Sequence, residues 1–300
     1  MSANQAAMIV PWRRAVARAP ERLPVLCIAT LMTVAVVWNS WVGLRWQPAE
    51  AAILGPALAL LAIAAYAASR SIRQLSETSF YLCLWYLFTA FAVRLTYLAF
   101  STGYPLQDAR LMAADAAIGF DWVHWSRFIG AHSLVYRLQG LAYMSILLQI
   151  PLLVTVSAFC RPRARNAETF IAICVALATT VAIATFVPAI GPGDALGLRA
   201  DVGPVVPVVD TLRGGTSGVP LPYVGIVAFP SFHTVMAIQF AYALRGTRWL
   251  SPTALALNAL VLSSVPANGD HHLVDVLAGS IVAIAGIWIA RLLVCTRRNR

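Results

Sequence analysis

The segment at residues 169–190, TFIAICVALATTVAIATFVPAI, contains no charged side chain and consists mainly of aliphatic, small and aromatic residues. A helix of about 20 apolar residues is long enough to cross the hydrocarbon core of a bilayer. Such a helix also satisfies its own backbone hydrogen bonds where water is absent. We therefore predict a transmembrane helix at this position, and with it an integral membrane protein of the helical class.

The composition of the whole chain agrees with this prediction. Of the 300 residues, 60% are hydrophobic and only 11% are charged, and the mean hydropathy is +0.74. Soluble domains carry about 25% charged residues, so a soluble globular protein is excluded. A disordered chain is excluded as well, because it would leave too much apolar surface in water.

Eight segments in all are apolar enough to be considered as membrane spans. They lie at 24–44, 50–69, 79–100, 134–158, 169–190, 231–247, 249–266 and 272–294. The sixth and seventh are short and weakly separated from each other. The sequence thus predicts an all-α, polytopic membrane helical bundle with about eight transmembrane helices.

The basic residues indicate how this bundle is oriented. All 22 of them are arginine, and the formal net charge is +10. With the N-terminus in the cytoplasm, 15 arginines fall on the cytoplasmic side and six on the other, while Arg94 lies within a span. The positive-inside rule explains this excess better than a nucleic-acid partner does, and we predict none. We expect a multi-pass protein of the inner (plasma) membrane with both termini inside.

Two long segments then face the exterior. The first, about 101–133, includes LQDARLMAADAAIGFDWVHWSRFIG, whose apolar residues recur at helical spacing and whose tryptophans suit a membrane interface. We predict a helix lying along the outer surface. The second, about 190–230, is rich in glycine and proline, which rules out a long helix and indicates an ordered loop or lid.

Three histidines lie at the outer ends of two predicted spans. His233 belongs to FPSFHT at the start of the sixth span, and His271 and His272 belong to GDHHLVDVLAG at the start of the eighth. Since both spans begin on the outer side, these groups can meet although 38 residues separate His233 from His271. Ionisable residues at membrane depth are costly and usually functional.

The helix starts favour binding of an anion there. Free backbone N–H groups and the positive ends of two helix dipoles would converge on a group such as phosphate. Ser231 and Asp270 are residue types that cap helix N-termini. His271 and Asp275 share a helical face, so Asp275 can orient the imidazole and leave its other nitrogen free as a nucleophile. A structural His–Asp pair in a polar patch is the alternative.

These residues resemble the motifs of a known family. PSFH at 230–233 and HxxxD at 271–275, followed by VLAG, are similar to the type 2 phosphatidic acid phosphatase and vanadium haloperoxidase superfamily. The closer resemblance is to its inositol-phosphorylceramide-synthase-like branch, where a bulky residue replaces the glycine of a Pro-Ser-Gly-His motif, as Phe232 does here. The resemblance is strong over about 188–295 and weaker over the interfacial segment.

This resemblance implies a division of the chain. Residues 1–78 would form an N-terminal transmembrane extension, since the resemblance is almost absent before residue 79. Residues 79–300 would form a phosphatase-like membrane domain with a six-helix core. No metal and no organic cofactor are implied, and a catalytic vanadate is not expected in so apolar a chain.

The resemblance also implies roles for individual residues. His271 would attack phosphorus, Asp275 would orient and charge-balance it, and His233 would protonate the leaving alkoxide. Ser231 would help to hold the phosphate.

Two departures from the family pattern leave the phosphate without its usual cation. The Lys-x6-Arg-Pro clamp cannot exist in a chain without lysine, and Val265 follows Ser264 where an arginine would stand. Phosphoryl transfer without a metal depends on such positive charge. Arg94 is the first candidate, with snorkelling of its side chain to the interface as the alternative. The outer-side candidates are Arg137, Arg199 and Arg213.

The sequence therefore predicts an enzyme that acts at the outer face on a membrane lipid phosphate, through a phosphohistidine. Water as the acceptor gives a lipid phosphatase, and an alcohol gives a lipid head-group phosphotransferase; both remain open. A lipid transporter or scaffold is a third hypothesis. It is less favoured because phosphate binding alone requires cations rather than a nucleophile and an acid. The sequence does not indicate the oligomeric state.

Overall fold

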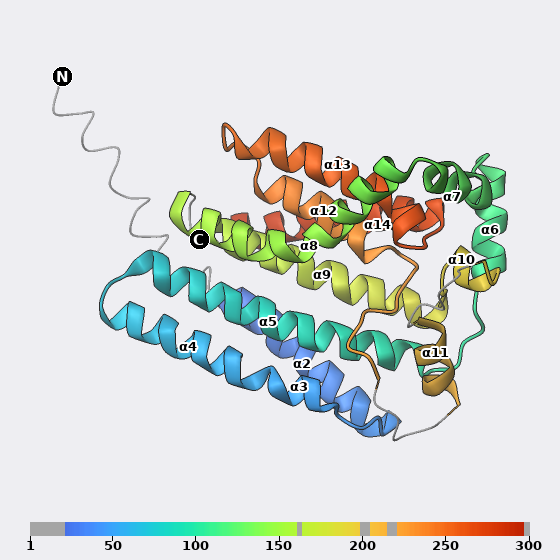
Figure 1. Ribbon diagram of the computed structural model, residues 1–300. Coiled ribbons are helices and arrows are strands. Elements are labelled where there is room, and N and C mark those ends of the chain that lie inside the picture. Colours follow the sequence, from blue (N-terminus) through green and yellow to red (C-terminus); the bar gives the residue numbers. More distant parts are fainter. Residues whose placement is uncertain (1–21, 161–163, 199–204, 215–220, 297–300) are drawn as a thin grey trace.

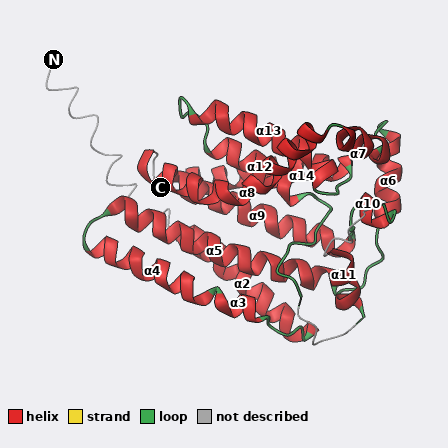
Figure 2. Ribbon diagram, viewed as in Figure 1, coloured by secondary structure: helices red, strands yellow, loops and turns green. Residues whose placement is uncertain are grey.

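The computed structural model describes residues 22–160, 164–198, 205–214 and 221–296. Every regular element in these ranges is a helix (Figures 1 and 2). The prediction of an all-α, polytopic bundle is confirmed.

Among the described residues, six helices are long and apolar enough to cross a membrane. They are α2 (Arg22–Val42), α5 (Arg73–Phe100), α8 (Ser133–Cys160), α9 (Ala164–Phe186), α13 (Leu250–Asn268) and α14 (Leu273–Thr296). The other two predicted spans correspond to shorter helices. These are α12 (Phe232–Ala243) and the pair α3 (Pro48–Ala52) and α4 (Leu54–Ser69).

The sequence explains why these two spans are shorter than predicted. Pro56 has no backbone N–H and is tolerated in the first turn of a helix but not in its interior. The helix therefore restarts at Leu54 instead of running through from Pro48. In α12, Ser231 caps the start, and Gly246 adopts a left-handed backbone conformation (φ 75°) soon after the end.

Four short helices gather at one end of the bundle, on the right in Figure 1. They are α6 (Asp108–Ala117), α7 (Trp122–Ala131), α10 (Pro192–Ala195) and α11 (Val205–Arg213). The single surface helix expected over 101–133 is thus two helices. The break follows from Gly119, whose φ is 79°, and from Asp121, which caps α7 by accepting a hydrogen bond from the backbone N–H of His124 at 3.0 Å.

The opposite end of the bundle holds the turn between α4 and α5 and the turn between α12 and α13 (Figure 1). The arginines at these two turns, at positions 70, 73, 245 and 248, lie on the side that the sequence assigns to the cytoplasm. The short helices α6, α7, α10 and α11 therefore lie at the end that the sequence assigns to the exterior.

The core lies between α5, α9 and α12. Trp85 packs edge-to-face against Phe88, Phe170 and Phe240, with ring centroids 5.5–5.8 Å apart. Helices α2 and α4 pack on α5, and α2 contributes apolar side chains to the same core. The N-terminal helices are thus part of one bundle, and the domain boundary expected at 78/79 falls inside α5.

Two glycines let α14 approach its neighbours closely. A Cβ atom added at Gly279 would lie 2.5 Å from the backbone oxygen of Ser231, and one at Gly286 would lie 2.8 Å from that of Ala172. Small residues permit such helix contacts in membrane proteins. The contact at Gly279 fixes the first turns of α14 against the start of α12, where the predicted site lies.

Candidate active site

The predicted site residues come from two neighbouring helix starts. Ser231 and His233 lie at the start of α12, while His271 and Asp275 lie just before and within the first turn of α14. The backbone N–H of Ser231 donates to the backbone oxygen of Asp275 at 3.1 Å. The structure therefore brings these four residues to one place in the fold, at the end that carries the short helices.

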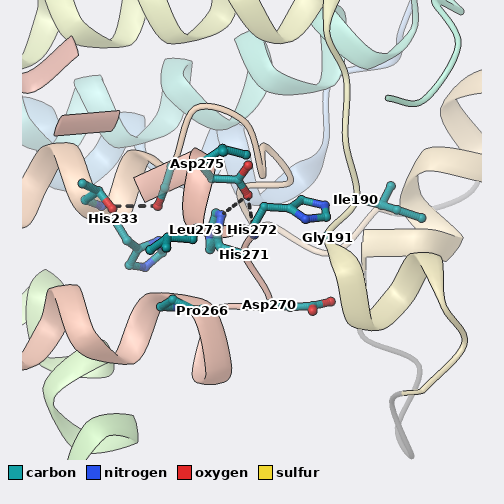
Figure 3. A network of polar contacts seen from close by, with 12 residues as sticks. Ile190, Gly191, His233, Pro266, Asp270, His271, His272, Leu273 and Asp275 are labelled. Atoms are coloured by element: carbon teal, nitrogen blue, oxygen red, sulfur yellow. Dashed lines mark hydrogen bonds and ion pairs between the residues drawn. The ribbon is translucent and has the colours of Figure 1, made fainter. Parts of the chain in front are cut away.

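His271 and Asp275 form the predicted hydrogen bond. Nδ1 of His271 is 3.1 Å from Oδ2 of Asp275, and both side chains are buried (Figure 3). The same carboxylate oxygen accepts the backbone N–H of His272 at 2.9 Å, which holds it in position. Because Nδ1 is engaged, Nε2 is the ring nitrogen of His271 that remains for chemistry.

His233 has a partner that the sequence did not predict. Its Nδ1 lies 3.0 Å from the hydroxyl of Tyr143 on α8, and the two rings stack with centroids 4.0 Å apart. The stacking and the hydrogen bond together fix the plane of the imidazole. A polar aromatic residue within an apolar span is the signal that marks Tyr143 in the sequence.

Gly269 joins the two histidine groups. A Cβ atom built on this residue would lie 2.8 Å from Cε2 of Tyr143 and 2.9 Å from Cδ2 of His271. Both rings therefore lie within 3 Å of one point. Because His233 stacks on Tyr143, His271 and His233 belong to one site, and a larger residue at position 269 would push them apart.

Ser231 and Asp270 were both expected to cap helices. Ser231 does cap α12, since its Oγ accepts the backbone N–H of Thr234 at 3.4 Å. The expectation for Asp270 is wrong. Its carboxylate accepts the backbone N–H groups of Gly193 and Asp194 at 2.7 and 3.0 Å and so holds α10. Asp270 has a left-handed backbone (φ 56°), and its side chain points away from His271 (Figure 3).

The start of α14 is capped from another helix. Asp115 on α6 accepts the backbone N–H of Leu273 at 3.0 Å and that of Val274 at 2.9 Å. These N–H groups were expected to be free for a phosphate. They are occupied because the surface helix α6 packs on the start of α14. An acidic cap here also suits the positive end of the helix dipole.

His272 is fully buried between two carboxylates of α6. Its Nδ1 is 3.4 Å from Asp115 and its Nε2 is 3.6 Å from Asp108. Asp108 also accepts the backbone N–H groups of Ile190 and Gly191, and the His272 ring points toward this loop, away from His271 (Figure 3). Asp108 and Asp115 are seven residues apart, or two helical turns, and this spacing was the signal in the sequence.

The charge of His272 is set by these neighbours. Burial by itself lowers the pKa of a histidine. Here the contact with Asp108 and the negative charges of Asp275, Asp115 and Asp108 outweigh burial, and the pKa of His272 is raised. The neighbouring carboxylates therefore favour the charged form of His272, which joins α6 to α14.

Replacement of Asp115 by alanine is expected to destabilise the protein. It removes the cap of α14 and one of the two carboxylates beside His272. A lost cap alone costs about 1 kcal/mol, and a broken buried ion pair costs more. Thermal unfolding in detergent measures the loss. Asp121→Ala, which removes the exposed cap of α7, is the matched control, and an equal loss in both variants would contradict a role for the ion pair.

Stability is also expected to depend on pH through His272. Because the folded-state pKa is raised above the usual 6.5, the ion pairs contribute fully below pH 6.5. This contribution is lost as pH rises through the folded-state value. The free energy of unfolding of the wild type should therefore fall on the alkaline side. In His272→Asn this fall should be weaker, and an identical pH profile in the two proteins would contradict the assignment.

The residues of this site also lie within a region that matches a known protein family. A family model described as the PAP2 superfamily matches residues 109–289, more than half of the chain, and the match includes His233, His271 and Asp275. The chain belongs to the PAP2 superfamily. No curated protein and no solved structure matches it. Membership of the PAP2 superfamily supports a phosphatase-type activity.

In this PAP2 superfamily member, the guanidinium of Arg94 contacts groups other than the histidines. It forms an ion pair with Glu50, donates to Asn39 at 3.3 Å and stacks over Trp46 at 4.4 Å. Its side chain is 1% exposed, so it does not snorkel either. Phosphate binding and snorkelling, the two expectations for Arg94, are both corrected. A buried arginine requires an acidic partner, and Glu50 supplies it.

The other three candidate cations of this PAP2 superfamily member differ in position. Arg137 is exposed on α8, and Arg199 lies outside the described residues. Arg213 ends α11 and donates to the backbone oxygen of Tyr104 at 2.6 Å. Its Nε is buried and has no hydrogen-bond partner among the described residues. Burial lowers the pKa of Arg213, and the charges of Asp210 and Asp108 oppose this.

Proposed function

We propose that the protein hydrolyses a phosphate ester of a membrane lipid through a phosphohistidine on His271. The observation that supports the proposal is the buried His271–Asp275 pair beside the ring stack of His233 and Tyr143. A histidine whose Nδ1–H is held by a carboxylate presents the lone pair of Nε2. A buried site also strengthens every charge interaction within it.

In the first step, Nε2 of His271 attacks phosphorus, a nitrogen–phosphorus bond forms, and the bond from phosphorus to the lipid oxygen breaks. Burial and the neighbouring His271 lower the pKa of His233, so it is the negative charge of the bound phosphate that favours the protonated form in which His233 acts. Its Nδ1–H donates to the Tyr143 hydroxyl, so Nε2–H faces the leaving oxygen and transfers its proton. Asp275 stabilises the positive charge that develops on His271.

In the second step, a water molecule attacks the phosphohistidine. The neutral His233 now accepts the proton of this water through Nε2. The nitrogen–phosphorus bond breaks, inorganic phosphate leaves, and both histidines return to their starting protonation states. An alcohol can replace water in this step without a change in the roles of the residues, which gives the head-group phosphotransferase.

The phosphate requires a cation, because Asp275, Asp108 and Asp115 place negative charge around the site. We propose Arg213 for this role. Its Nε has no partner among the described residues, and it lies close enough to Asp108 for the two charges to interact. Asp108 in turn contacts His272, next to the nucleophile. Arg199 is the second candidate. Ser231 supports the phosphate less directly, because its hydroxyl caps α12.

The proposal is tested with the purified full-length protein and a panel of labelled lipid phosphates, with and without alcohol acceptors. Release of inorganic phosphate supports a phosphatase, and transfer of the phosphate group to the alcohol supports a transferase. His124→Ala is the matched control for the variants His271→Ala and His233→Ala, since His124 is exposed on α7. A folded protein that produces neither product from any lipid phosphate would contradict the proposal and favour a transporter or scaffold.

We further propose that the site faces the exterior, the periplasm in a cell with an inner membrane. The expected result is that Ala113→Cys, exposed on α6, reacts with a membrane-impermeant thiol reagent in intact cells, in a background without other cysteines. Cys160, exposed at the end of α8, is the natural control for the opposite side. In a variant that keeps Cys160 as its single cysteine, this residue should react only after the cells are lysed. The reverse pattern would invert the orientation.

A further inference from the structure

An apolar cavity of about 590 Å³ lies between α4, α5 and α8, outside the histidine site. Aliphatic and aromatic side chains form most of its lining, among them Leu60 on α4, Tyr86 on α5 and Leu147 on α8. Cavities of this size are typical of small-ligand sites. Leu147 and Tyr86 are exposed at the surface of the bundle, so the cavity opens sideways, toward the lipid that would surround these helices.

One face of α8 leads from the histidines to this cavity. Tyr143, which stacks on His233, is four residues before Leu147 and eight before Pro151, and the latter two line the cavity. Residues at these spacings lie above one another on a helix. The face extends for about 12 Å from Tyr143 to Pro151. A molecule with its head at His233 can therefore place a chain along α8 into the cavity.

A row of aromatic rings provides a second connection. Trp85 lines the cavity and packs against Phe88 at 5.5 Å, and Phe88 stacks on Phe232 at 6.3 Å. Phe232 directly precedes His233. The wall of the cavity and the position of the proposed acid are thus mechanically linked by two ring contacts within the core.

Tyr223 adds a polar group at the cavity. It lies in the segment that leads into α12, and its hydroxyl is buried without a hydrogen-bond partner among the described residues. A buried polar atom left in this state is unusual in folded proteins and calls for an explanation. An ester, ether or amide oxygen of a lipid, at the junction of its head group and its chains, would supply the missing acceptor.

We propose that this cavity binds a hydrocarbon chain of the lipid whose phosphate reaches His271. The inference rests on the proposed function and adds a site to it. Two of its walls, α4 and α5, precede the region matched by the PAP2 superfamily, which begins at residue 109. The N-terminal helices of this chain would therefore select the lipid by its chain.

The test is photo-crosslinking of the full-length His271→Ala variant in phosphatidylcholine vesicles. One probe is a lipid phosphate with a photoreactive group in its chain, and the other is the same lipid with a hydroxyl in place of the phosphate. We expect several-fold more adducts on Tyr86 and Leu147 with the phosphate probe. Leu148, which is adjacent but 74% exposed to the surrounding lipid, should be labelled equally by both.

A matched pair of variants provides a kinetic test. Leu147→Trp narrows the cavity and should lower kcat/KM for long-chain relative to short-chain lipid phosphates by about tenfold. Leu148→Trp adds the same bulk outside the cavity and should leave this ratio as in the wild type. The ratio is measured within one variant, so a loss of folded protein does not alter it.

The possible results separate this inference from the proposed function. Equal labelling of Tyr86 and Leu147 by the two probes would mean that the cavity holds bulk lipid, and would overturn the inference even if the wild type releases phosphate. An unchanged chain-length ratio in Leu147→Trp would overturn it as well. Preferred labelling by the phosphate probe, without any turnover by the wild type, would support the chain site and contradict the proposed reaction.

Discussion

His271→Ala is expected to abolish turnover and to leave the protein folded. In the proposed reaction His271 supplies the atom that bonds to phosphorus, and no other group can replace a covalent step. Loss of such a nucleophile lowers kcat by at least about 10⁴-fold. Asp275 loses its imidazole partner but keeps the hydrogen bond from the backbone N–H of His272, so we expect some loss of stability without unfolding. Phosphate release and thermal unfolding, measured on the same preparation, give the two readouts.

His272→Ala is the informative comparison for this variant. His272 is adjacent in sequence, but it lies between Asp108 and Asp115, and its removal leaves buried carboxylates without their partner. Such a loss costs about 3–5 kcal/mol of stability. We therefore expect His272→Ala to unfold at lower temperature while its folded fraction still turns over substrate. An active His271→Ala together with an inactive, fully folded His272→Ala would show that the nucleophile is misassigned.

The membrane helices could be predicted from sequence because hydropathy and length determine them locally. The segment 169–190 begins inside α9 (Ala164–Phe186) and ends four residues beyond it. The Gly/Pro-rich segment at about 190–230 has no long helix among its described residues, but it has the two short helices α10 and α11. The predictions were less accurate where a single proline or glycine decides the boundary. The breaks at Pro56 and Gly119 illustrate this, since both interrupt segments whose hydropathy would allow a continuous helix.

Within the site, the contacts that could be predicted are those between residues close in sequence. The His271–Asp275 bond follows from a spacing of four and is present. The contacts of Tyr143 with His233 and of Asp115 with α14 join residues 90 or more positions apart, and no periodicity indicates such pairs. The ion pair of Arg94 could not be predicted for the same reason, because its partner Glu50 is 44 residues away in the sequence.

The second large effect is expected for His233→Ala, and it depends on the leaving group. A general acid contributes about 10²–10⁴-fold, but it does so when the departing oxygen needs a proton. A lipid alkoxide needs this proton, whereas an activated aryl oxide leaves largely without it. His233→Ala should therefore lose most of its activity on a lipid phosphate and much less on an aryl phosphate. His271→Ala should lose both activities alike.

Tyr143→Phe refines this prediction, because it keeps the ring that stacks on His233 and removes the hydroxyl that its Nδ1 contacts at 3.0 Å. If Tyr143 positions the protonated imidazole, the variant should show the same dependence on the leaving group as His233→Ala, to a smaller extent. Both variants are measured with both substrates, and the ratio of the two activities is compared within each variant. An equal loss on the two substrates in His233→Ala would remove His233 from the role of the acid. It would then be a group that binds phosphate or fixes the start of α12.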